Sequence, residues 1–321
     1  MMQFFVPYGH KAFWGIALIT LLFAGLGMAV LQLTRRFQLK SYQDMVNYLL
    51  GRRIGQAIDG VITVFLFLGL CIMLAGSGAI FEEHLGSTAE LGIGLAVVCL
   101  VVVLAGEVKG VVWFNSLLVP LKFLICLGVS LTVVVKGKGA LPTICPGAPD
   151  LTPVSEHWVL ASILYVSYNM VLGTVILVSL GDYVSRSGSL MGAAWGGAGL
   201  GLFALAIVYT LQINYPAVTQ YEVPMLYIAA CIHPFLKYFY AVILWIGILT
   251  TALVNAYGFA KRLTALSGMP YMLNLGLTIV LAIPFAQYRF STLVGTIYPL
   301  FGYIGLALLG GLLIRARQIL K

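Results

Sequence analysis

Long apolar runs alternate with short polar stretches along the whole chain. A helix needs roughly 20 mostly apolar residues to cross the hydrocarbon core of a bilayer. The sequence therefore predicts nine spans, at residues 12–33, 57–81, 91–106, 111–135, 157–180, 192–213, 236–260, 271–287 and 290–314. The third and eighth spans are short. Val223–Pro234 is apolar but shorter still and bracketed by prolines, so we expect a re-entrant or interfacial helix there.

The composition agrees with this pattern and sets the fold class. Of the 321 residues 61% are hydrophobic and 9% are charged, whereas a soluble domain has about 25% charged residues. We therefore expect an all-α polytopic membrane protein whose surroundings are the lipid bilayer. The formal net charge of +8 then reflects the loops and gives no reason to expect a nucleic-acid partner. The five cysteines show no CxxC spacing, so neither a disulfide framework nor a metal site is expected.

The distribution of basic residues predicts the orientation. Twelve of the 18 Lys and Arg residues fall on one side of the predicted spans and five on the other, and Lys122 lies within a span. The positive-inside rule places the richer side in the cytoplasm. We expect a multi-pass protein of the inner (cytoplasmic) membrane with its C-terminus in the cytoplasm and its N-terminus outside.

A weak internal repeat relates the two halves of the chain. Gly15 aligns with Gly192, Met45 with Met225, and Pro120 with Pro299, at offsets of 177, 180 and 179 residues. The second copy follows an odd number of spans, so the copies have opposite orientation, as in many secondary transporters. We expect one transmembrane domain built of two repeats, residues 1–155 and 156–321. The alternative is that any two sets of apolar helices can be aligned somewhere.

The span 157–180 has polar residues near its middle, about eleven residues from either end and thus close to the bilayer midplane. Asn and Ser side chains can hydrogen-bond a polar solute, Tyr can provide a stacking wall, and a glycine would let the chain turn. The substrate-binding candidates are Tyr165, Ser167, Tyr168, Asn169 and Gly173. The alternative is that these groups hold neighbouring helices together, as polar residues often do in membrane bundles.

Lys122 follows Pro120 in the span 111–135 and would lie about 15 Å deep at 1.5 Å per residue. An ammonium at that depth is costly, so we expect it to face the protein interior and to have a role such as proton exchange. The alternative is a lysine that snorkels to the membrane surface. Farther along the chain, Thr250, Thr251 and Asn255 lie within one span, and the last two share a face of the helix. With Lys122 these three are the candidate ion-coupling residues.

Three segments resemble a known family. "MQFFVPYGHKAFWGI", "LYVSYNMVLG" and "ILTTALVNAYGFAKRL" are similar to the YkvI-like family of bacterial membrane proteins, a branch of the amino acid–polyamine–organocation (APC) superfamily with the LeuT fold. The resemblance covers essentially the whole chain. It implies a 5+5 inverted repeat of which nine of ten spans are present. The family's Gly-rich first helix, which precedes Gln3-Phe4-Phe5, is missing, so we expect a late-assigned start codon or a truncated gene product.

The resemblance also implies roles for the polar residues. In this fold the sixth helix is broken at its centre, which here would unwind Ser167-Tyr168-Asn169. Hydroxyls of the eighth helix coordinate Na⁺ in some members, a position that Thr250 and Thr251 match, whereas a fifth-helix lysine replaces Na⁺ in others. If Lys122 points to these threonines, the coupling ion is H⁺ or none; otherwise Na⁺ stays an option. The alternative for each threonine is a hydroxyl bonded to its own helix.

No catalytic pattern accompanies these residues. Glu82, Glu83 and His84 are expected in an outer loop without metal-ligand spacing. We therefore expect no enzymatic activity and no cofactor besides a coupling ion, Na⁺ or H⁺. The hypothesis is an ion-coupled secondary transporter for an amino acid or similar small polar solute, working by alternating access. The alternative is a non-transporting solute sensor or accessory membrane protein; an intramembrane enzyme would need a nucleophile–base or metal pattern.

Overall fold

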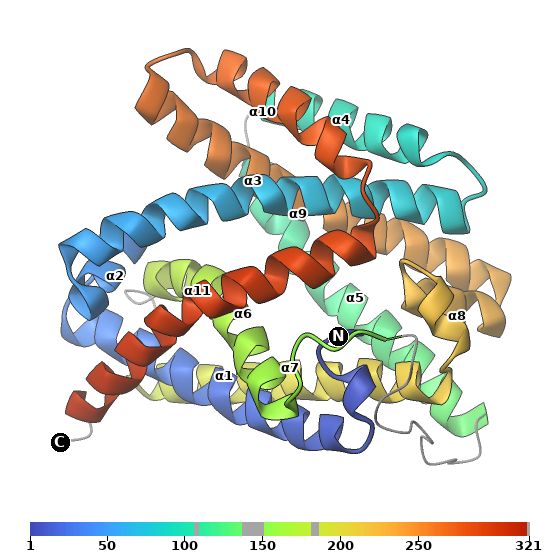
Figure 1. The fold of residues 1–321 in the computed structure, drawn as a ribbon, viewed down its shortest axis with the longest axis horizontal. Helices are drawn as coiled ribbons and strands as arrows, with labels where there is room; N and C mark the ends of the chain where they lie inside the picture. The colour runs from blue at the N-terminus through green and yellow to red at the C-terminus, as the bar shows by residue number, and fades with distance from the viewer. Residues whose placement is uncertain (106–108, 137–150, 181–185, 320–321) are drawn as a thin grey trace. The chain divides into compact units, whose positions relative to one another are not determined.

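The described chain folds almost entirely into α-helices, which Figure 1 labels in chain order. The structure is a computed structural model and describes residues 1–105, 109–136, 151–180 and 186–319. Within these ranges the elements are η1 (Val6–Tyr8), α1 (Lys11–Arg36), α2 (Tyr42–Leu50), α3 (Arg52–His84), α4 (Ala89–Ala105), α5 (Lys109–Lys136), α6 (Trp158–Leu180), α7 (Arg186–Ile213), η2 (Ala217–Gln220), α8 (Pro224–Ile232), α9 (Pro234–Ser267), α10 (Tyr271–Ala286) and α11 (Phe290–Ile319).

Each of the nine predicted spans coincides with a helix, and the segment between the two prolines forms the nine-residue α8. Among the described residues six helices are long and apolar enough to cross a membrane, namely α1, α3, α6, α7, α9 and α11. Three apolar helical stretches are shorter: Ala89–Ala105, Val119–Val135 and Tyr271–Ala286. Helices are expected in such segments because lipid offers no hydrogen bonds to the backbone.

Large apolar side chains are exposed along these helices. Leu21, Trp195 and Val280 are 72%, 73% and 65% exposed. A soluble monomer rarely leaves large contiguous apolar patches on its surface, whereas in a bilayer such side chains contact acyl chains. The exposed apolar surface and the long apolar helices together support a multi-pass membrane location.

The chain divides into two compact units, each assembled from separate stretches of sequence. The first unit comprises Met1–Ile62, Pro142–Gln212 and Gly295–Lys321, and the second comprises Thr63–Leu141 and Ile213–Val294. Helices α3 and α11 therefore each contribute to both units. The boundaries do not follow the predicted halves of the chain.

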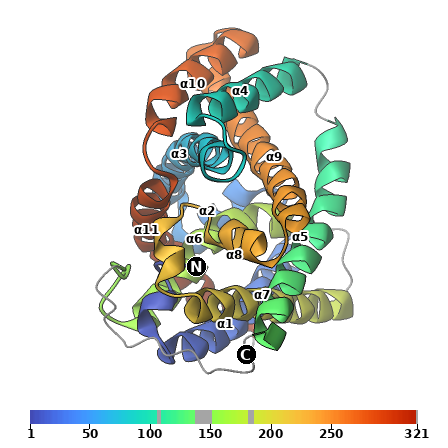
Figure 2. The ribbon, with the colours of Figure 1, turned by 90° about the vertical axis from the view of Figure 1, so that its right-hand side faces the viewer.

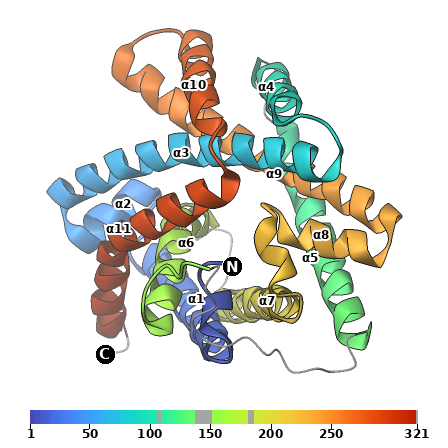
Figure 3. The same cartoon turned by 45° about the vertical axis from the view of Figure 1, so that its right-hand side comes forward.

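In the first unit, α1 packs against α6 and α7, and Figure 3 shows α1 running beside α7. Two glycines of α7 permit this close approach. A Cβ added at Gly197 would lie 2.7 Å from the backbone nitrogen of Ala24, and one added at Gly201 would overlap Thr20. Small residues allow helix backbones to approach closely, which is the usual basis of helix association in membranes.

In the second unit, the long helix α9 contacts α4, α5, α8 and α10, and Figure 2 shows α4 and α10 side by side. Its core is formed by apolar side chains of α3, α4, α9 and α10. Buried members include Leu70, Leu74, Leu100, Ala256 and Ile279. These residues recur at helical spacing along each element, which is why the core forms where the apolar faces meet.

The short helix α2 begins with a capping box. Ser41 Oγ accepts the backbone N–H of Asp44 at 3.1 Å, and Asp44 Oδ2 accepts the N–H of Ser41 at 3.0 Å. This arrangement satisfies two backbone donors that a helix start otherwise leaves unpaired.

Two predictions about local structure are wrong. Helix α6 runs without interruption from Trp158 to Leu180, so Ser167-Tyr168-Asn169 is helical and Gly173 makes no turn. Glu82, Glu83 and His84 form the last turn of α3 and not a loop. His84 is only 3% exposed, so packing around it extends the helix past the end that hydropathy predicted.

Candidate functional site

The polar residues at the centre of α6 point to different neighbours. Ser167 is fully buried and donates its hydroxyl hydrogen to the carbonyl oxygen of Gly302 in α11 at 2.6 Å. A Cβ added at Gly305, also in α11, would lie 2.5 Å from Ser167 Oγ. Ser167 therefore links α6 to α11, which is the helix-packing role considered above as the alternative to binding.

An aromatic cluster surrounds the adjacent tyrosines. The rings of Tyr168 and Tyr298 stack with centroids 4.8 Å apart, and Tyr168 meets Tyr165 edge-on at 5.5 Å. Phe4 and Phe5 contact Tyr165 at 5.5 and 5.2 Å. From sequence, Phe4 and Phe5 are only part of a family motif, whereas in the structure they pack against α6. Edge-to-face and offset aromatic pairs of this kind add about 0.5–1.5 kcal/mol each beyond burial.

A cavity of about 490 Å³ lies against a third face of α6. Tyr165, Asn169 and Gly173 line it, because residues four apart lie on one side of a helix. Helix α1 contributes Ile19, Phe23, Gly27 and Leu31 to the lining, and α7 contributes Gly192 and Gly196 among others. Cavities of 300–1,000 Å³ lined by apolar groups with a few polar atoms are the usual form of small-molecule sites.

The structure therefore brings together three of the five predicted substrate residues. Tyr165, Asn169 and Gly173 line the cavity, whereas Ser167 and Tyr168 are not part of its lining. Asn169 Nδ2 donates to the carbonyl oxygen of Tyr165 at 2.7 Å. Because Ser167 finds an acceptor on α11 and Asn169 finds one within the intact α6, no unwinding is needed to satisfy these two side chains.

In the second unit, Lys122 reaches from α5 to α9. A Cβ added at Gly247 would lie 2.6 Å from Lys122 Nζ, so the lysine side chain runs directly across this glycine. The carbonyl oxygen of Gly247 accepts the hydroxyls of Thr250 and Thr251 at 3.0 and 2.9 Å. Lys122 and the hydroxyls of Thr250 and Thr251 thus each contact Gly247 of α9.

In the sequence, the one feature that points to Gly247 is that it is a small residue one helical turn before the two threonines. Asn255, the fourth predicted coupling residue, packs elsewhere. Its Nδ2 would lie 2.6 Å from a Cβ added at Gly69 of α3, so Asn255 contacts α3. Both threonine hydroxyls bond within their own helix, which is the alternative considered for them, although a donating hydroxyl still has lone pairs for a cation.

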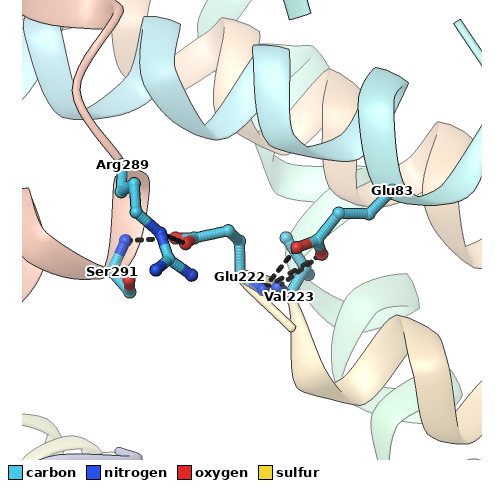
Figure 4. A network of polar contacts seen from close by, with 5 residues as sticks. All are labelled: Glu83, Glu222, Val223, Arg289 and Ser291. Atoms are coloured by element: carbon cyan, nitrogen blue, oxygen red, sulfur yellow. Dashed lines mark hydrogen bonds and ion pairs between the residues drawn. The ribbon is translucent and has the colours of Figure 1, made fainter. Parts of the chain in front are cut away.

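The second unit also contains a polar network that hydropathy gave no reason to expect (Figure 4). The Glu83 carboxylate accepts the backbone N–H of Glu222 at 2.8 Å and that of Val223 at 3.3 Å. The Glu222 carboxylate accepts Arg289 Nε and the N–H of Ser291, both at 2.6 Å. The end of α3, the segment before α8 and the start of α11 are joined by these bonds, beside a cavity of about 780 Å³.

These features define a multi-pass membrane protein, helical in its described residues, with a cavity among α1, α6 and α7. No family model matches the chain. It is 29% identical over 315 residues to the uncharacterized membrane protein YkvI of Bacillus subtilis (strain 168), covering 98% of this chain and 89% of YkvI. It is 27% identical over 311 residues to the uncharacterized protein YyaD of the same strain, covering 96% and 88%. These similarities support a YkvI-like family of membrane proteins, as the quoted motifs predict.

Proposed function

We propose that the protein is an ion-coupled secondary transporter of the LeuT fold, in the APC superfamily, for an amino acid or similar small solute. A repeated order of helix lengths carries this proposal. Helices α1 to α5 have 26, 9, 33, 17 and 28 residues. Helices α7 to α11 have 28, 9, 34, 16 and 30 residues. Helix α6 stands between the two series without a counterpart.

The spacing between the two series is nearly constant. Helices α2, α3 and α4 begin at positions 42, 52 and 89, and α8, α9 and α10 begin at 224, 234 and 271, each 182 residues later. This offset is close to the 177–180 residues given by the sequence matches. Five predicted spans precede α7, so the second series starts on the opposite side of the membrane. Both observations support an inverted repeat, the architecture of many secondary transporters.

The two compact units add independent support. Helices α1 and α7, which correspond in the two series, belong to the same unit, and so do α4 and α10, whereas α2 and α8 belong to different units, as do α5 and most of α11. Each unit thus combines matching helices from both proposed repeats, residues 1–155 and 156–321. We propose that transport proceeds by alternating access, in which the two repeats move relative to each other.

We propose H⁺ as the coupling ion. The contact between Lys122 and Gly247 supports this choice, because an ammonium beside the glycine whose carbonyl binds both threonine hydroxyls would repel a nearby cation such as Na⁺. The expected partners are the solute and the lipid bilayer, and we propose neither an enzymatic activity nor a cofactor. We further propose an inner-membrane location with a cytoplasmic C-terminus, which C-terminal reporter fusions would test.

Uptake by proteoliposomes tests the transport proposal. The purified protein is reconstituted, a pH gradient or a Na⁺ gradient is imposed, and uptake of a panel of labelled amino acids and neutral analogues is measured. We expect uptake that follows the pH gradient, disappears with a protonophore and does not require Na⁺. Uptake driven by Na⁺ alone would overturn H⁺ coupling, and binding without any uptake or exchange would overturn transport.

The unbroken α6 favours a second candidate, a non-transporting solute sensor or accessory membrane protein with the same fold. A continuous helix leaves no unpaired backbone groups at mid-membrane, whereas transporters of this architecture usually have them. Counterflow separates the two candidates. A sensor binds its solute but does not exchange labelled for unlabelled solute across the bilayer.

A further inference from the structure

The cavity among α1, α6 and α7 has a lining that restricts its ligand. We propose that it binds a neutral solute with a bulky apolar body and one hydrogen-bonding end, and that Gly192 and Gly196 set the size of that body. The binding claim rests on the cavity alone, and only its use in transport rests on the proposed function. This proposal narrows the expected solutes to molecules whose apolar part is larger than their polar part.

Polar side chains occupy one wall of the cavity only. Among its described lining residues the polar side chains are Tyr165 and Asn169, both on α6, and none is an acid, a lysine, an arginine or a histidine. Opposite them lie apolar side chains such as Phe23, Leu31 and Phe203. An unpaired charge in such surroundings is strongly disfavoured, whereas one neutral polar group can bond to the α6 wall.

The room for the apolar body comes from glycines of α7. Gly192 and Gly196 are four residues apart and line the cavity, and a Cβ added at either would meet no atom within 4 Å. A side chain at either position would therefore meet no steric obstacle, and because both glycines line the cavity we expect it to reduce the cavity's volume. Gly197 has a different role, because its added Cβ would touch the Ala24 backbone.

Binding to purified protein in lipid nanodiscs tests the proposal. The probes are indole, L-tryptophan, L-leucine, glycine, L-glutamate and L-lysine. We expect indole to bind more tightly than L-tryptophan, whose ammonium and carboxylate find no charged side chain among the described lining residues, and the last three to bind most weakly. Preferential binding of glycine, glutamate or lysine would overturn the proposal. So would a co-purified phospholipid that indole does not displace, because it would identify the cavity as an acyl-chain site.

Substitutions in α7 test the size claim. We expect Gly192→Leu and Gly196→Leu to weaken indole binding by at least about tenfold, equivalent to about 1.4 kcal/mol. Gly199→Leu is the matched control, because Gly199 lies on α7 outside the lining and its added Cβ also meets no atom within 4 Å. If a leucine variant does not fold, Gly192→Ala replaces it in the test. We expect this smaller substitution to weaken indole binding while the unfolding temperature stays unchanged.

Equal weakening by Gly199→Leu, or unchanged binding in both cavity variants, would overturn the size claim. The outcomes for binding and for transport are separable. Indole binding without counterflow would reject the transporter and keep the cavity. Uptake of a charged solute that Gly192→Leu leaves unchanged would keep the transporter and reject the cavity as its site.

Discussion

Arg289 Nε donates to Glu222 Oε1 at 2.6 Å, and the other oxygen of the same carboxylate accepts the backbone N–H of Ser291 at the same distance. The two partners differ in exposure, since the side chain of Glu222 is 10% exposed and that of Arg289 is 71% exposed. The largely buried Glu222 carboxylate, more than the exposed Arg289, therefore holds the start of α11 against the segment before α8.

Glu222→Ala is expected to lower the free energy of unfolding by about 2–3 kcal/mol, because it removes both bonds and leaves the Ser291 N–H without this acceptor. Arg289→Ala should cost less than about 1 kcal/mol, since ion pairs with a solvent-exposed member contribute little. Denaturant unfolding in detergent micelles measures both. Equal losses would mean that the ion pair, and not the bond to the backbone, holds α11.

Gly247→Leu is expected to push the Lys122 side chain away from α9, because even a Cβ there would lie 2.6 Å from Nζ. If Lys122 carries the coupling proton, this variant should lose the pH dependence of uptake as Lys122→Ala does. Gly128→Leu is the control on α5, where an added Cβ meets no atom within 4 Å. Uptake by Gly247→Leu with a normal pH profile would contradict a coupling role for this contact.

Ser167 and Asn169 should respond differently to truncation. Ser167→Ala removes the bond to Gly302 and should destabilise the protein by about 1 kcal/mol without changing solute affinity. Asn169→Ala should weaken solute binding, because Asn169 lines the cavity. Binding and unfolding measured on the same samples distinguish the roles, and a loss of affinity in Ser167→Ala would restore it as a binding residue.

The glycines of α7 give a further contrast in stability. Gly197→Ala should destabilise by about 1–3 kcal/mol, since its Cβ would lie 2.7 Å from the backbone nitrogen of Ala24, which cannot move aside alone. Gly199→Ala faces open space and should be neutral or stabilising by up to about 1 kcal/mol. Thermal unfolding of both variants checks this. Similar unfolding temperatures would show that α1 and α7 are less closely packed than described.

The sequence by itself determined the class of protein and the positions of its helices. A membrane-spanning segment must satisfy its backbone hydrogen bonds internally, so a long apolar run has little choice but to be helical. A helix forms at each of the nine predicted spans, and six of these helices are long and apolar enough to cross a membrane. The start of α2 could be predicted as well, because its capping box lies within four residues of sequence.

Only the tertiary structure decided which polar residues share a site. Ser167 and Asn169 are two residues apart, which at 100° per residue places them about 200° apart around α6, so one meets α11 and the other the cavity. Hydropathy cannot assign those neighbours. The contact of Lys122 with Gly247, and that of Glu222 with Arg289, join distant parts of the sequence. Such pairs depend on how helices pack, and packing is determined by the shapes of both partners together.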